Sequence, residues 1–154
     1  MADGNGALSL HTENDALRAA LAAEHVAVWG YGVVGGALGP DKRATAAASE
    51  NAHRDVRDKV TALLVDRKVD PVREQAAYTL PFPVLSAVDA AALGVVLEDG
   101  AAAAWVRVLD QATERSTRQL AVGMLSATEI RAVGWRGAAG KKPVTSALPG
   151  LPKK

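Results

Sequence analysis

Residues 17–40, LRAALAAEHVAVWGYGVVGGALGP, contain the pattern that decides the fold class. Apolar residues recur there at steps of three and four, beginning at Leu17 and Leu21, and this is the spacing of one face of an α-helix. Gly39-Pro40 ends the pattern, because glycine tolerates the conformation that closes a helix and proline cannot continue its hydrogen bonds. The stretch predicts a long first helix over residues 12–38.

The same periodicity predicts three more helices, at about 41–65, 86–112 and 116–136. Short connections make the first and second helices, and the third and fourth, antiparallel pairs. The connection of roughly 20 residues between the pairs can extend roughly 60 Å, which is longer than any of these helices. We therefore predict an all-α, ferritin-like four-helix bundle of two hairpins joined by a long crossover, over residues 1–137, with a Pro- and Gly-containing tail at 138–154.

Composition narrows the function classes. The 154 residues suit a single domain, and 49% are hydrophobic but only 4% aromatic, which favours closely packed helices. The net charge of +1 is too small for a protein that binds nucleic acid. The absence of cysteine excludes disulfides, cysteine-ligated zinc and thiol catalysis. Because no segment has the pattern of a secretory signal or a membrane span, we expect a cytoplasmic protein without a membrane partner.

Four polar residues on the apolar faces of these helices form a candidate metal site. Glu24 belongs to the first helix, Glu50 and His53 to the second, and Glu98 to the third. Glu50 and His53 form the E-x-x-H motif, which in bundles with two metal ions supplies a carboxylate and an imidazole from one helix. The fourth helix has Glu129, but Ala132 stands where the second histidine of such a site is needed. The ligand set is therefore incomplete.

Three segments carry a resemblance to a known family: residues 23–32 (AEHVAVWGYG), 52–58 (AHRDVRD) and 97–105 (LEDGAAAAW). With residues 131–136 and 148–152, they make the chain resemble the ferritin-like superfamily, and in particular a bacterial ferritin-like family of unknown function. The resemblance extends over nearly the whole chain from about Leu17. It implies a fold, since the narrower family has no settled activity. The departure at Ala132 argues against an ordinary ferroxidase.

Two interpretations of the buried acids remain open. In the first, Glu24, Glu50, His53 and Glu98 bind one or two ions such as Fe or Mn, which favour carboxylate-rich ligation. In the second, which is equally plausible, no metal is bound and the protein is an interaction or scaffold bundle. Arg57, one helical turn after His53, would then neutralise the carboxylates.

Two further features have simpler explanations than they first suggest. Gly30, Gly32 and Gly35 match a nucleotide-binding G-x-G-x-x-G motif, but Pro40 follows too soon for the helix that such a motif needs. We interpret these glycines as positions where a neighbouring helix approaches closely. The Ala- and Gly-rich helix faces also favour a homodimer. The substrate, if there is one, is not indicated by any motif.

Overall fold

The computed structural model describes residues 3–152, with their side chains from Gly6 onward. Over this range the chain forms four helices and no strand, and the helices are α1 (Asp3–Ala37), α2 (Pro40–Asp66), α3 (Ala87–Gln111) and α4 (Arg115–Ala138). The predicted all-α, four-helix architecture is confirmed. No helix within residues 3–152 is long and apolar enough to cross a membrane.

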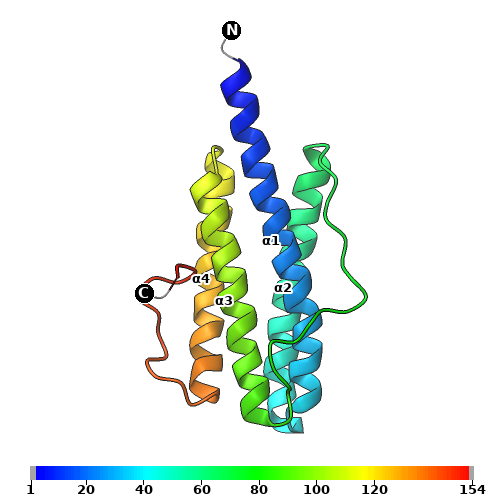
Figure 1. Cartoon of the computed structure of the whole chain (residues 1–154), viewed down its shortest axis with the longest axis vertical. Helices are drawn as coiled ribbons and strands as arrows, with labels where there is room; N and C mark the ends of the chain where they lie inside the picture. Colours follow the sequence, from blue (N-terminus) through cyan, green and yellow to red (C-terminus); the bar gives the residue numbers. More distant parts are fainter. Residues whose placement is uncertain (1–2, 153–154) are drawn as a thin grey trace.

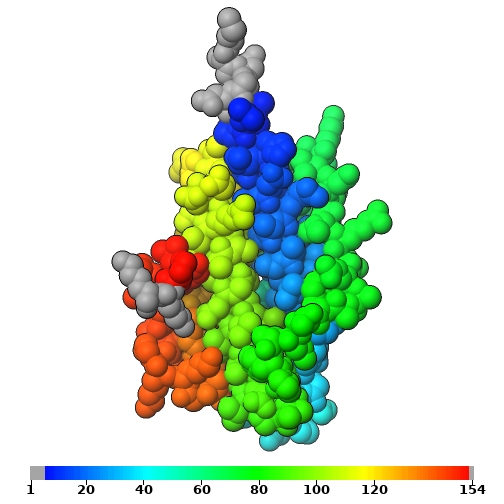
Figure 2. All heavy atoms as spheres, in the orientation of Figure 1, coloured from blue at the N-terminus to red at the C-terminus, as the bar shows by residue number. Residues whose placement is uncertain are grey.

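The helices are arranged as two antiparallel hairpins (Figure 1). The chain descends along α1, returns along α2, and then follows the crossover of residues 67–86 back down the full length of the bundle before α3 begins. Helix α1 packs against both α2 and α3, and α3 packs against α4. Figure 2 shows the crossover and the C-terminal segment on opposite sides of the face formed by α1 and α3. The long crossover is thus the feature that makes α2 and α3 parallel.

The helix ends follow from local chemistry, with one difference from the prediction. Helix α1 begins at Asp3 and not at the predicted Thr12. The Thr12 hydroxyl donates to the Ser9 carbonyl within the helix (2.8 Å) and does not cap a helix end. Helix α2 starts with Pro40, whose fixed φ suits the first turn. Helix α3 is capped by Ser86, which accepts a hydrogen bond from the Asp89 amide at 3.1 Å.

The N-terminus of α4 is capped from another helix. The Glu13 carboxylate of α1 accepts hydrogen bonds from the Thr113 amide (2.6 Å) and the Glu114 amide (3.0 Å). The same carboxylate accepts the Thr117 hydroxyl and an N–H of Arg67. Burial alone would raise the pKa of Glu13, but these hydrogen bonds lower it to about 2. This end of the bundle is therefore joined by a buried, ionised carboxylate.

The apolar core is divided into two clusters with a polar layer between them. One cluster lies around Tyr31, Leu93 and Trp135, and the other lies around Leu21 and Trp105. On α1, α2 and α3 the boundary between the clusters falls at Glu24, His53 and Glu98, all at most 1% exposed. The fold thus places these three polar groups at one level, near the middle of the bundle, whereas the equally buried Glu13 lies at its end.

Candidate functional site

His53 is the centre of the polar layer. Its Nδ1 lies 2.5 Å from Glu24 Oε2, and its Nε2 lies 3.2 Å from Glu98 Oε1. The imidazole therefore bridges carboxylates from α1 and α3, while the Tyr31 ring stacks beside it with ring centroids 5.5 Å apart. Three helices meet at one side chain.

Three further donors complete the hydrogen bonding of the carboxylates. Trp105 Nε1 donates to Glu24 Oε1 at 2.8 Å. The Tyr31 hydroxyl donates to Glu98 Oε1 at 2.5 Å, and Arg131 Nε on α4 lies 3.0 and 3.1 Å from the two oxygens of Glu98. Within the described residues, every buried side-chain nitrogen or oxygen has a hydrogen-bond partner. We call these six residues, Glu24, Tyr31, His53, Glu98, Trp105 and Arg131, the core network.

The protonation states of the core network follow from its contacts. Burial alone would lower the pKa of His53, but the hydrogen bonds to Glu24 and Glu98 outweigh it and raise the pKa to about 9. Burial would raise the pKa of Glu98, but His53 and Arg131 together hold it below its ordinary value. Burial and the Glu98 carboxylate raise the pKa of Tyr31, so its phenol stays neutral and donates. At neutral pH two carboxylates therefore face one imidazolium and one guanidinium, and the charges balance.

The structure brings together three of the four predicted metal ligands. Glu50 lies apart from Glu24, His53 and Glu98, and its carboxylate pairs with Arg54 on the flank of α2. The reason is geometric, because residues three apart on a helix differ in direction by about 60°. When His53 points at the bundle axis, Glu50 points beside it.

Arg57 does not neutralise the core carboxylates, so that part of the second interpretation was wrong. Its guanidinium pairs with Asp58 at 2.8 Å, and its side chain is 27% exposed. The hydrogen bond to Asp58 raises the pKa of Arg57. Arg131 of α4 supplies the charge that the sequence analysis assigned to Arg57. Arg131 directly precedes Ala132, which is 1% exposed and faces the core, but no pattern in the sequence of α4 singles out this arginine.

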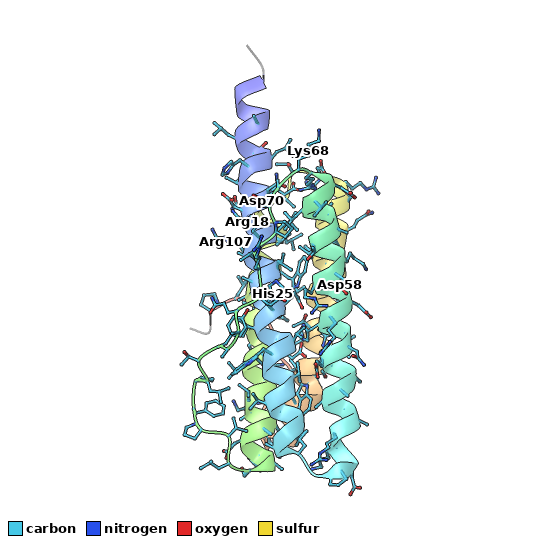
Figure 3. The ribbon with its side chains drawn as sticks, turned by 90° about the vertical axis from the view of Figure 1, so that its right-hand side faces the viewer. Arg18, His25, Asp58, Lys68, Asp70 and Arg107 are labelled. Carbon is cyan, nitrogen blue, oxygen red and sulfur yellow. The ribbon has the colours of Figure 1, made fainter. Side chains whose placement is uncertain are left out.

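The other histidines and the glycine motif lie outside the core network. His25 of α1, labelled in Figure 3, is 7% exposed, and its ring bonds the Val72 carbonyl of the crossover at 3.0 Å. His11 pairs with Asp15 on the surface. Gly30 lies inside α1, where an added Cβ would come within 2.6 Å of the Leu97 side chain. Close helix packing therefore explains Gly30, and no strand precedes it in the described chain.

The core network, as arranged, does not fit a metal ion. An imidazole that ligates a metal must offer a lone pair, whereas each ring nitrogen of His53 faces a carboxylate and the raised pKa of His53 favours the imidazolium, which offers none. The oxygens of Glu24 and Glu98 already accept from Trp105, Tyr31 and Arg131. Across residues 3–152 no group of three or more histidines or acids is arranged to hold a metal ion.

Fold and site together define an all-α four-helix protein with a closed, charge-balanced polar layer in its core. The family described as a domain of unknown function, DUF4439, matches residues 16–153, and the chain belongs to this family. This confirms the predicted resemblance to a family of unknown function. Among solved structures it is similar to a conserved hypothetical protein, rv2844, from Mycobacterium tuberculosis, with a TM-score of 0.80 and 35% identity. The match covers 82% of this chain and 96% of that one. No curated protein matches the chain.

Proposed function

We propose that this protein is a metal-free bundle that acts by binding a partner or ligand, and that its core network aligns the four helices. One observation carries the proposal: each ring nitrogen of His53 lies within hydrogen-bonding distance of a carboxylate, which accepts, and Arg131 supplies the second positive charge. Within the described residues, every buried side-chain nitrogen and oxygen of the network already has a hydrogen-bond partner in the protein.

Helix alignment is the role that such a network performs best. A buried ion pair gains little net free energy over an apolar core, since desolvation of the charges offsets their attraction. Mispairing is costly, however, because an unpaired buried charge destabilises by several kcal/mol. Sliding any helix by one turn, about 5.4 Å, would leave Glu24 or Glu98 without its donors. The network therefore favours one register of the helices. The packing of small apolar side chains alone would distinguish only weakly between this register and its alternatives.

The competing function is a site for Fe or Mn at Glu24, Glu50, His53 and Glu98. It is favoured by the meeting of Glu24, His53 and Glu98 from three helices. It requires His53 to lose one of its two ring protons and Glu50 to leave Arg54 and turn inward.

Metal analysis and thermal unfolding distinguish the two functions. The purified protein is loaded anaerobically with Fe(II) or Mn(II), desalted and analysed for bound metal, beside Glu98→Gln as the site variant and Glu50→Ala. We expect far less than one ion per chain and no rise of Tm with metal. Stoichiometric metal with a rise of Tm, both lost in the variants, would overturn the proposal, because a ligand that binds only the folded state stabilises it.

We also propose that the protein is a homodimer. Support comes from the outer face of α4, where Val122 is 50% and Ile130 74% exposed beside small residues such as Gly123 and Gly134. Light scattering of the wild type and of Ile130→Glu tests this, and a monomeric wild type would contradict it.

A further inference from the structure

The C-terminal segment after α4 forms a cavity with the bundle, and no residue of the core network lines it. Residues 141–152 leave the end of α4, stand away from the bundle and return to α3 (Figure 1). The cavity beneath it is open to solvent on one side, has a volume of about 890 Å³ and is bounded on the bundle side by Val95 and Arg136. This volume lies in the range of about 300–1,000 Å³ that is usual for sites that bind small molecules.

The segment is held in place at three points. Arg136 Nη1 donates to the Val144 carbonyl at 3.0 Å, and the Ser146 amide donates to Glu129 Oε1 at 2.9 Å. Glu129 binds both the segment and Arg136, whose Nη1 donates to Glu129 Oε1 at 2.7 Å. Helix α4 continues through this region, because the Ser126 hydroxyl donates to the Val122 carbonyl at 2.9 Å.

The third attachment point depends on a glycine. Gly150 has φ +77°, a conformation that other residues rarely adopt, and it lies directly against α3. A Cβ at this position would be 2.5 Å from the Ala102 carbonyl oxygen. The segment is therefore fixed before and after the part that stands away, and the space beneath it is part of the fold.

The lining of the cavity indicates the chemistry of a ligand. Most of the lining is apolar and comes from the segment itself, including Leu148 and Leu151, which remain 64% and 47% exposed. Lys141 and Lys142 also line the cavity, and neither side chain has an ion-pair partner among the described residues. Arg136, by contrast, is neutralised by Asp99 and Glu129.

We propose that this cavity binds an amphipathic anion with a single alkyl chain, such as an alkyl carboxylate of about ten carbons. The alkyl chain would cover Leu148 and Leu151, and burial of their exposed apolar surface would drive binding. The carboxylate would pair with Lys141 and Lys142, for which the described part of the chain supplies no ion-pair partner. Because the cavity shares no residue with the core network, this proposal stands or falls independently of the metal-free function.

Calorimetric titration with decanoate tests the proposal, with 1-decanol and decylamine as head-group controls. We expect saturable binding of one decanoate per chain and weaker binding of both controls. The double variant K141A/K142A should bind decanoate about tenfold or more weakly, since it loses two ion pairs. The charge-matched control is K42A/K59A, on the surface of α2, and it should bind as the wild type does.

A third variant tests the attachment of the segment. G150V should release the segment from α3 and abolish binding, while its helical circular dichroism and its thermal unfolding remain close to those of the wild type. Absence of saturable decanoate binding by the wild type, or equal affinity of K141A/K142A and K42A/K59A, would overturn the proposal. The proposal would also be overturned if the wild type were a dimer that dissociates in G150V but not in the presence of decanoate. A second chain, and not a small molecule, would then occupy the cavity.

Discussion

Raising the pH should weaken the protein through His53. Its pKa is raised from 6.5 to about 9 in the folded state, so the folded protein holds a proton that the unfolded chain releases. A group with a raised pKa contributes its full stability below pH 6.5 and loses it as the pH rises through 9. Each tenfold change in proton affinity corresponds to about 1.4 kcal/mol, so the loss amounts to about 3 kcal/mol.

Urea unfolding at intervals between pH 6 and 9.5 measures this loss. The wild type should lose about 3 kcal/mol over the range, while His53→Gln, which cannot be protonated, should start less stable and change little. The two curves should therefore converge at high pH. The matched control is His11→Asn, since His11 lies on the surface beside Asp15, and it should keep the decline of the wild type.

The reasoning fails if the difference between the wild type and His53→Gln is the same at pH 6 and 9.5. An independent check that needs no variant is an NMR titration of the wild-type imidazole of His53. A midpoint near 9 supports the argument, and a midpoint near 6.5 refutes it.

Three further predictions use the same measurements. Arg131→Ala should destabilise the protein by about 2 kcal/mol, which is less than the loss of a fully buried ion pair because the Arg131 side chain is partly exposed. Arg57→Ala should destabilise it by less than about 0.5 kcal/mol, and equal effects of the two variants would contradict the core network. Glu13 contributes stability that is present above pH 4.5 and is lost as the pH falls towards 2, so Glu13→Gln should be less stable at neutral pH and should lose less stability in acid. Unfolding measured at intervals between pH 5 and 2 tests this, and the same dependence of stability on pH in both proteins would contradict it. Gly94→Ala would place a Cβ 2.7 Å from the indole ring of Trp135 and should destabilise by about 1–3 kcal/mol. Gly32→Ala, on an exposed position of α1 with open space around it, should stabilise by up to about 1 kcal/mol, and the reverse order of Tm would refute the packing argument.

Much of the fold was predictable because it depends on local periodicity and on one length. The stripe from Leu17 and the Gly39-Pro40 break define the end of α1, and the long connection after α2 leaves room for a crossover that spans the bundle. The start of α1 was not predictable from capping chemistry alone. Nothing between Asp3 and Thr12 forbids a helix, so hydroxyl groups that often cap helices bond to carbonyls within this one instead.

The site was predictable to the extent that it follows from single helices. An acid on an apolar stripe, such as Glu24 or Glu98, must find a partner in the core, and His53 on the stripe of α2 is one. The choice between Arg57 and Arg131 depends on how α2 and α4 are rotated relative to each other. That rotation is set by packing between helices, and neither helix determines it by itself.

The core network also explains how a bundle of this kind can keep its buried acids without a metal. Two carboxylates at one level need two positive charges, which one divalent cation or two protein cations can supply. Here Ala132 leaves no second imidazole, and the residue before it, Arg131, reaches Glu98. Arginine keeps its charge throughout this range of pH, but the imidazolium of His53 loses its proton as the pH rises through about 9. At alkaline pH the charge balance of the core network therefore depends on His53. The pH at which the protein weakens is therefore the pH at which a competing cation would first find a free lone pair on His53.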